Sequence, residues 1–185
     1  MKSIVIAIMR YLLNLKRPSK AANTRLLQQR GERLDSLLIR EAVDGDLPAL
    51  AALHVKTWIG TYLNVKHPPT YEIREYQWKE QFQVRDGSWF CFVIVNASGE
   101  LVGFAKGKRE PNGKGGLNKI YLLREYQRLG LGRLLLCHVA RRFNCFHPQN
   151  PGFLINGSRI SGSHYQNCHR VLRPPILYRS LSTSH

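Results

Sequence analysis

The spacing of hydrophobic positions changes along the chain, and each change marks an expected element. Between residues 47 and 61, positions that suit a protein interior recur at steps of three and four, which predicts an amphipathic helix ending near Tyr62. The residues on this face are Leu47, Leu50, His54, Trp58 and Thr61. Asp44 or Asp46 is a suitable N-cap for the helix.

A second helix and a series of strands complete the pattern. The prolines of "HPP" at 67–69 interrupt the first helix, and another helix is expected from about residue 70 to 83. Residues 89–95, "WFCFVIV", are apolar throughout, as expected of a strand covered on both faces. The expected strands are 36–42, 89–95, 101–108 and 117–123. This order predicts an α/β protein with a mixed α+β sheet and no internal repeats.

Basic residues concentrate toward the two ends of the chain. The 185 residues include 28 Lys or Arg and 12 Asp or Glu, a net charge of +16. Residues 1–35 and 126–185 hold most of the excess, and 126–185 contain no acidic residue. Such a charge attracts nucleic acids, anionic membranes or polyphosphate ligands. A basic nucleic-acid-binding protein is therefore an alternative function, although the chain has no nucleic-acid-binding motif and its middle is nearly neutral.

Composition divides the chain into three expected parts. Residues 1–35 form a basic N-terminal extension, whose last twenty residues are expected to be a linker or mobile helix. A folded core is expected over 36–143, and residues 144–185 form an atypical tail rich in Arg, His, Ser and Pro. No stretch is long enough to span a membrane, and the apolar N-terminus lacks a clear signal-cleavage site, so the expected location is the cytoplasm.

The cysteines show no pattern of a disulfide framework or of a metal site. They are Cys91, Cys137, Cys145 and Cys168, without a CxxC pair. The tail adds histidines, but the combined Cys and His spacing fits no standard zinc pattern, and no metal is expected. A reduced setting is expected, with the cysteines in the core or incidental.

A glycine-rich basic turn joins the last expected strand to a helix. In "EYQRLGLGRLL", residues 125–135, Gly130 and Gly132 precede a helix whose apolar face is formed by Leu135, Leu136, Val139 and Phe143. The first turn of a helix has unpaired N–H groups and a partial positive charge, glycine lets a ligand approach the backbone, and Arg128 and Arg133 add full charges. The turn suits a phosphate-type anion, or it is simply a tight structural turn. Dinucleotide and Walker fingerprints both fail here.

Residues 127–132, "QRLGLG", resemble the Q/R-x-x-G-x-G/A pyrophosphate loop of the GNAT acetyltransferase superfamily. The preceding "KIYLLREY" is similar to the fourth strand of that family. "LHVKTWIGTY" resembles its first helix, and "FVIVNASGELVGFAKG" its second and third strands. The resemblance covers residues 37–143 and implies an acyl-CoA N-acyltransferase fold.

The resemblance also implies a reaction and a set of binding residues. The reaction is transfer of an acetyl group from acetyl-CoA to a primary amine by direct attack, without a covalent enzyme intermediate. Backbone groups of the fourth strand would bind the pantetheine arm, and loop amides would bind the pyrophosphate. The positions concerned are Ile120, Tyr121, Leu122, Arg128, Leu129, Gly130, Leu131, Gly132 and Arg133. A CoA-binding fold without turnover is the other alternative, and a monomer and a homodimer both stay open.

The acceptor side and the proton-transfer groups are less defined. Small amines, aminoglycosides, peptide N-termini and lysine side chains all stay open as acceptors. Trp58 and Tyr62 are candidates for an acceptor pocket or for core packing. Glu100, Glu110 and His54 are candidates for accepting the proton of the amine, and each has an ordinary interpretation as a turn, loop or half-buried helix residue.

The tail departs from the family pattern. The family continues with a fifth strand, a helix with a Tyr that protonates the leaving thiolate, and a closing hairpin. Here "GFLIN" can serve as the fifth strand, and only Tyr165 stands near the expected place of the Tyr. The bias of the tail is typical of a shifted reading frame or of a segment released from selection for packing. The C-terminal part of the fold is therefore expected to be incomplete or irregular, with weak CoA binding and slow catalysis.

Overall fold

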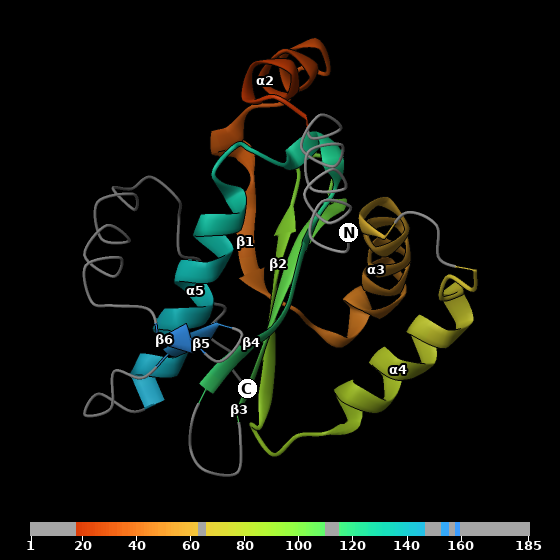
Figure 1. Cartoon of the computed structure of the whole chain (residues 1–185), viewed down its shortest axis with the longest axis vertical. Helices are drawn as coiled ribbons and strands as arrows, with labels where there is room; N and C mark the ends of the chain where they lie inside the picture. Colours follow the sequence, from red (N-terminus) through yellow and green to blue (C-terminus); the bar gives the residue numbers. More distant parts are fainter. Residues whose placement is uncertain (1–17, 63–65, 110–114, 147–152, 156–157, 160–185) are drawn as a thin grey trace, which may run out of the picture.

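The computed structural model of the chain describes residues 18–62, 66–109, 115–146, 153–155 and 158–159 (Figure 1). These residues contain a sheet with the strand order β1-β2-β3-β4-β5-β6. The strands are β1 Leu38–Glu41, β2 Trp89–Val95, β3 Leu101–Arg109, β4 Gly115–Leu122, β5 Phe153–Ile155 and β6 Ser158–Arg159. Neighbouring strands are antiparallel except for β4 and β5, which are parallel. The predicted mixed sheet is confirmed.

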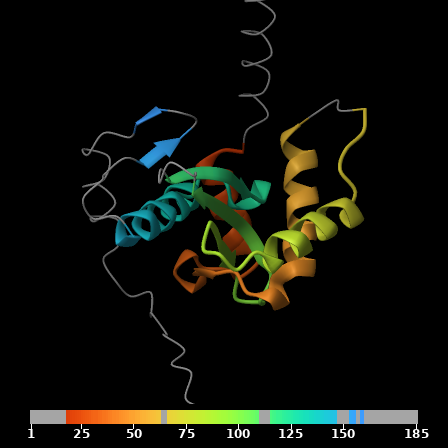
Figure 2. The same cartoon turned by 90° about the horizontal axis from the view of Figure 1, so that it is seen from below.

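The described helices are α2 Lys20–Gln29, α3 Leu47–Thr61, α4 Tyr71–Gln83 and α5 Leu131–Phe146, and the last three cover the two faces of this sheet. Helix α5 lies on one face, and α3 and α4 lie together on the other, as the view along the sheet shows (Figure 2). Three short 3-10 turns, Leu34–Ser36, Asp44–Asp46 and Arg124–Tyr126, connect these elements.

Strand β2 separates two hydrophobic cores, because its side chains alternate between the two faces. Phe90 and Ile94 pack in the core beneath α5, whereas Cys91 and Val93 pack in the core beneath α3 and α4. All four are buried. The uniformly apolar sequence of this strand thus reflects burial on both faces, as predicted. Burial also raises the pKa of the Cys91 thiol, which suits packing and not nucleophilic chemistry.

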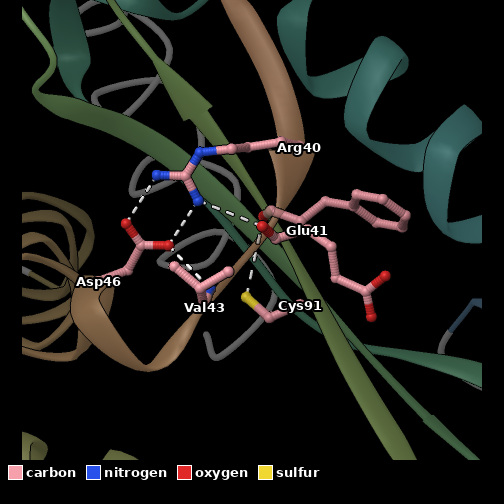
Figure 3. Close-up of polar contacts among 6 residues, drawn as sticks. Arg40, Glu41, Val43, Asp46 and Cys91 are labelled. Atoms are coloured by element: carbon pink, nitrogen blue, oxygen red, sulfur yellow. Dashed lines mark hydrogen bonds and ion pairs between the residues drawn. The ribbon is translucent and has the colours of Figure 1, made fainter. Parts of the chain in front are cut away.

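An ion pair fixes the turn from β1 into α3 (Figure 3). The Arg40 guanidinium donates two hydrogen bonds to the Asp46 carboxylate, at 2.6 and 2.7 Å. The Val43 backbone N–H donates to the same carboxylate at 2.9 Å. Asp46 therefore lies at the start of the helix as predicted. Its carboxylate accepts hydrogen bonds from Arg40 and from the Val43 N–H, however, and not from an amide of α3.

Ordered structure begins before the expected residue 36. In α2, Ser19 caps the first turn by accepting a hydrogen bond from the Ala22 N–H at 3.0 Å. Leu27 is 3% exposed and belongs to the core beneath α5, and Asn23 is 4% exposed. Of the two expectations for residues 16–35, a linker or a mobile helix, the structure has the helix, and Asn23 and Leu27 pack it against the rest of the fold. The division of the chain into three segments stays a prediction.

Candidate active site

A cleft of about 300 Å³ runs along one edge of β4. The cleft is lined by Thr61, Tyr62, Asn118, Lys119, Ile120, Tyr121, Leu122 and Gln127. Five of these are consecutive residues of one strand, whose side chains alternate between faces, so the cleft follows the strand edge. In the described part of the chain, β4 pairs with β5 only at Gly115 and Gly116. The later residues of β4 can therefore present backbone groups to a ligand.

A bulge in β4 lies beside this cleft. Lys106 pairs with Lys119, but the next residue of β3, Gly107, pairs with Leu117, so Asn118 is an extra residue in β4. Such an insertion bends and twists the strand and changes the direction of the side chains that follow. The bulged Asn118 is the first residue of β4 that lines the cleft, shortly after the pairing of β4 with β5 at Gly115 and Gly116.

The glycine-rich turn follows β4 and leads into α5. Arg128 and Gly130 have positive φ values of 65° and 87°. A Cβ at position 130 would meet no atom within 4 Å, so this position favours glycine for its backbone conformation and not for space. The first helical hydrogen bond runs from the Leu134 N–H to the Gly130 carbonyl at 3.1 Å. The amides of residues 131–133 therefore have no partner within the helix and are available to an anion.

Polar contacts from α2 and β4 fix this turn. The Asn23 Nδ2 donates to the backbone carbonyls of Arg124 and Gln127, both at 2.9 Å. The Gln127 Nε2 donates to the Leu122 carbonyl at 3.1 Å. The Leu122 backbone was predicted to bind the pantetheine arm, and its carbonyl thus already accepts one hydrogen bond within the protein. The Tyr126 hydroxyl contacts the Glu32 carboxylate. The role of Asn23 was not predicted, because a single polar residue in a basic helix gives no periodic signal.

Two tyrosines face each other across the cleft. Tyr62 follows the last residue of α3 and lines the cleft together with Tyr121 of β4. Burial, and then the Tyr62 hydroxyl, raise the pKa of Tyr121 to about 12, so its hydroxyl stays protonated at neutral pH. The Trp58 ring packs on the Tyr62 ring with centroids 4.9 Å apart, but Trp58 does not line the cleft. Of the predicted acceptor residues, Tyr62 is thus placed in the cleft and Trp58 behind it.

The predicted proton-transfer residues are not brought together in the described structure. Glu100 is exposed in the turn between β2 and β3, where its carboxylate accepts a hydrogen bond from Asn96 Nδ2 at 3.0 Å. It does not line the cleft. Glu110 and Tyr165 lie outside the described residues. Within the described ranges, no three His, Cys, Asp or Glu side chains are grouped to hold a metal ion.

His54 lies in the core between the cleft and α4. Its ring is 1% exposed, and its Nδ1 accepts a hydrogen bond from Trp78 Nε1 at 3.2 Å. Burial, and then the nearby cations Arg74, Lys119 and Lys106, lower the pKa of His54 to about 3. The imidazole is therefore neutral at physiological pH, and protonating it during a reaction would be unfavourable.

Comparison with protein families gives the class of this fold and site. The acetyltransferase (GNAT) family matches residues 48–147, more than half of the chain. The chain therefore belongs to the GNAT family and is a GNAT-type acetyltransferase. No curated protein sequence matches it. In the described ranges, no helix is both long enough and apolar enough to cross a membrane.

Solved structures support the same fold. The chain is similar to the PaiA N-acetyltransferase of Thermoplasma acidophilum in complex with coenzyme A, with a TM-score of 0.51 and 26% identity over 60% of this chain and 74% of that chain. It is similar to a GNAT acetyltransferase of Staphylococcus aureus Mu50, with a TM-score of 0.52 and 15% identity over 73% and 80%. An aminoglycoside N-acetyltransferase in complex with CoA matches with a TM-score of 0.51 and 18% identity over 83% and 98%.

Proposed function

We propose that the chain transfers the acetyl group of acetyl-CoA to a primary amine by direct attack of the amine on the thioester. The observation that carries this proposal is the continuity of the cleft along β4 with the turn at the start of α5. The strand edge offers backbone groups in a line, and the turn offers a cluster of unpaired amides at its end. A long ligand with a diphosphate at one end fits this arrangement.

Each part of the site has a proposed role in binding acetyl-CoA. The backbone of Ile120, Tyr121 and Leu122 holds the pantetheine arm, with the Leu122 carbonyl shared with Gln127. The amides from Arg128 to Arg133 receive the pyrophosphate, where the helix dipole and the two exposed guanidinium groups favour negative charge. Tyr62, on the opposite wall, borders the space that the acceptor enters.

The protein then orients the amine and controls its proton. The described residues that line the cleft include no Asp, Glu or His, so we expect the proton of the ammonium to leave to water or to a group outside this lining. Glu110 stays a proposed acceptor for it, and Tyr165 a proposed donor to the leaving thiolate. We assign no proton transfer to Glu100, because its carboxylate is bound to Asn96 in a turn that does not line the cleft.

A substitution in the turn tests the proposal. At Gly132 a Cβ would meet only Leu122 Cδ1, at 3.6 Å, so Gly132→Glu adds a negative charge without a clash at its first carbon. We expect this variant to bind acetyl-CoA at least tenfold more weakly than the parent in calorimetric titration. Gly45→Glu is the matched control, because a Cβ there meets no atom within 4 Å and the net charge changes equally. It should bind within twofold of the parent.

Thermal and thiol-release assays separate the proposed enzyme from its alternatives. Ligand at 100 times its dissociation constant stabilises the folded state by about 2.7 kcal/mol, a shift of roughly 5–10 °C in a chain of this size. Such a shift with acetyl-CoA, with thiol release on adding amines, supports the proposal. A shift without thiol release would indicate a CoA-binding fold without turnover. Equal acetyl-CoA affinity of Gly132→Glu and the parent would overturn the proposed binding site.

A further inference from the structure

Two lysines lie directly opposite each other on β3 and β4. Lys106 and Lys119 are paired residues of these strands, so their side chains leave the same face of the sheet. That face is covered by α3 and α4. Lys106 is only 8% exposed, and Lys119 is half-buried. Two like charges at opposed positions destabilise a sheet, and burial increases the effect, so this arrangement needs a physical reason.

No carboxylate among the described residues pairs with either lysine. The Lys106 ammonium contacts the Gln81 amide oxygen and lies 5.6 and 5.4 Å from the ring centroids of Trp78 and Trp89. Burial lowers the pKa of Lys106 to about 8 and also lowers that of Lys119, with each neighbouring cation adding to the effect. The positive charge here is therefore poorly compensated.

Arg74 adds a third cation from α4. One of its terminal nitrogens donates to the Gln77 amide oxygen at 2.8 Å, whereas its Nε is buried and has no hydrogen-bond partner. Its positive charge acts on both His54 and Lys119. Arg74 thus adds positive charge near two residues that neighbour Lys106.

A small cavity lies among these groups. It has a volume of about 20 Å³ and is lined by His54, Gln77, Trp78, Gln81, Lys106 and Lys119. This is room for one small polar group, since a single water needs about 10–15 Å³ on this measure. Lys119 lines both this cavity and the cleft along β4, so the two spaces are adjacent. We call this cavity the cationic pocket; Arg74 does not line it, but its charge acts on His54 and Lys119, which do.

We propose that the acceptor of this acetyltransferase is an amine that also carries a carboxylate, and that the carboxylate binds in the cationic pocket. This inference rests on the proposed function and names its acceptor class. A carboxylate would compensate Lys106 and Lys119, whereas a polyamine or an aminoglycoside would add positive charge to them. The same cations disfavour an ammonium and favour the neutral, nucleophilic amine, which suits a cleft where the described lining holds no carboxylate.

Matched pairs of small amines test the proposal with the full-length chain. Each pair differs by one carboxylate: glycine and methylamine, β-alanine and ethylamine, 4-aminobutyrate and n-propylamine. Binding is measured by calorimetry with the chain saturated with CoA, which permits no turnover, and again without CoA. We expect at least one carboxylate-bearing amine to bind tenfold or more tightly than its partner. The kcat/KM values from thiol release with acetyl-CoA should show the same preference.

Three variants assign that preference to the pocket. Lys106→Met and Lys119→Met keep an unbranched apolar side chain but remove the charge, and each should bring the ratio within a pair to threefold or less. Lys106→Met should also fold at least as stably as the parent, because it removes a buried charge. Lys79→Met, at an exposed position of α4, removes the same charge elsewhere and should leave the ratio unchanged.

The outcomes distinguish this proposal from the proposed function. Equal binding within every pair, binding of neither member, or a ratio unchanged in both pocket variants overturns the carboxylate pocket. If acetyl-CoA binds and supports thiol release in those cases, the acetyltransferase function stands. If acetyl-CoA does not bind but the carboxylate preference persists without CoA, the pocket stands and the proposed function falls.

Discussion

Replacing Asn23 by Asp should loosen the turn that leads to the candidate pyrophosphate loop. Asn23 Nδ2 donates to the carbonyls of Arg124 and Gln127, each at 2.9 Å, and the residue is 4% exposed. Both partners are acceptors only, so the group between them must be the amide N–H2. Aspartate has the same shape but offers a carboxylate oxygen there. The substitution therefore removes two donors without creating a cavity.

The expected loss of stability follows from these two contacts. Each neutral hydrogen bond contributes about 0.5–1.5 kcal/mol net, so their loss costs roughly 1–3 kcal/mol. A poorly solvated carboxylate beside two carbonyl oxygens adds to this, and we expect a loss of at least about 2 kcal/mol. In a chain of this size, this corresponds to about 4–8 °C in Tm. If the whole loss fell on the turn, it would weaken acetyl-CoA binding by roughly thirtyfold.

Calorimetric titration with acetyl-CoA and urea unfolding would test both effects. We expect Asn23→Asp to bind three- to thirtyfold more weakly than the parent. Thr24→Ala is the matched control, because Thr24 is only half-buried and its hydroxyl donates to the Lys20 carbonyl of its own helix, at 2.9 Å. It should bind within twofold of the parent. Unchanged affinity of Asn23→Asp would refute the inference that α2 positions the loop, and unchanged stability would refute the docking itself.

Two further predictions concern stability and pH. Asp46→Asn weakens the contacts with Arg40 and should lower the unfolding free energy by about 2–3 kcal/mol at pH 7. The hydrogen bond from Arg40 lowers the pKa of Asp46. The stability advantage of the parent over Asp46→Asn should therefore be complete above about pH 4 and be lost as pH falls through the folded-state pKa. An equal stability difference at pH 7 and well below that pKa, measured by urea unfolding, would contradict this. Burial lowers the pKa of His54 to about 3 from an unfolded value near 6.5. Between these pH values the unfolded chain binds more protons than the folded chain. The free energy of unfolding therefore falls on acidification, by up to about 1.4 kcal/mol per pH unit. His54→Leu should give a shallower slope in urea unfolding between pH 6.5 and 4, with a remainder from His138, whose pKa burial also lowers; an unaltered slope would argue against this origin.

Local patterns predicted the central elements because their signals lie within a few residues. The expected strand over 89–95 is β2, and the expected helix from residue 70 is α4, which starts at Tyr71 with Thr70 as its N-cap. Strand β4 starts two residues earlier than expected, at Gly115, because pairing with β5 extends it. A Cβ at Gly115 would lie 2.2 Å from the Phe143 ring. Gly115, which lies outside the expected strand over 117–123, therefore permits α5 to approach the sheet, which no local pattern predicts.

The docking of α2 was missed because it depends on very few buried groups. Of the residues in Lys20–Gln29, only Asn23 and Leu27 are buried. One apolar residue produces no helical period, and the surrounding sequence is polar and basic, as in a linker. The decisive contact is an amide side chain on two main-chain carbonyls about a hundred residues later. Backbone acceptors have no sequence signature, so this contact requires the structure.

The two halves of the candidate site differ in how far sequence can define them. The loop is made of backbone groups from one short segment, and glycine spacing makes such a segment recognisable. The cationic pocket is made of side chains from α3, α4, β3 and β4, whose separation in sequence forms no motif. Its charge also depends on the bulge at Asn118. If β4 paired with β3 without the bulge, in the register of Leu117, Asn118 would lie opposite Lys106 and Lys119 would turn to the other face of the sheet, because side chains alternate with a period of two. The bulge in β4 thus places the half-buried Lys119 beside the buried Lys106 on the face of the proposed acceptor pocket.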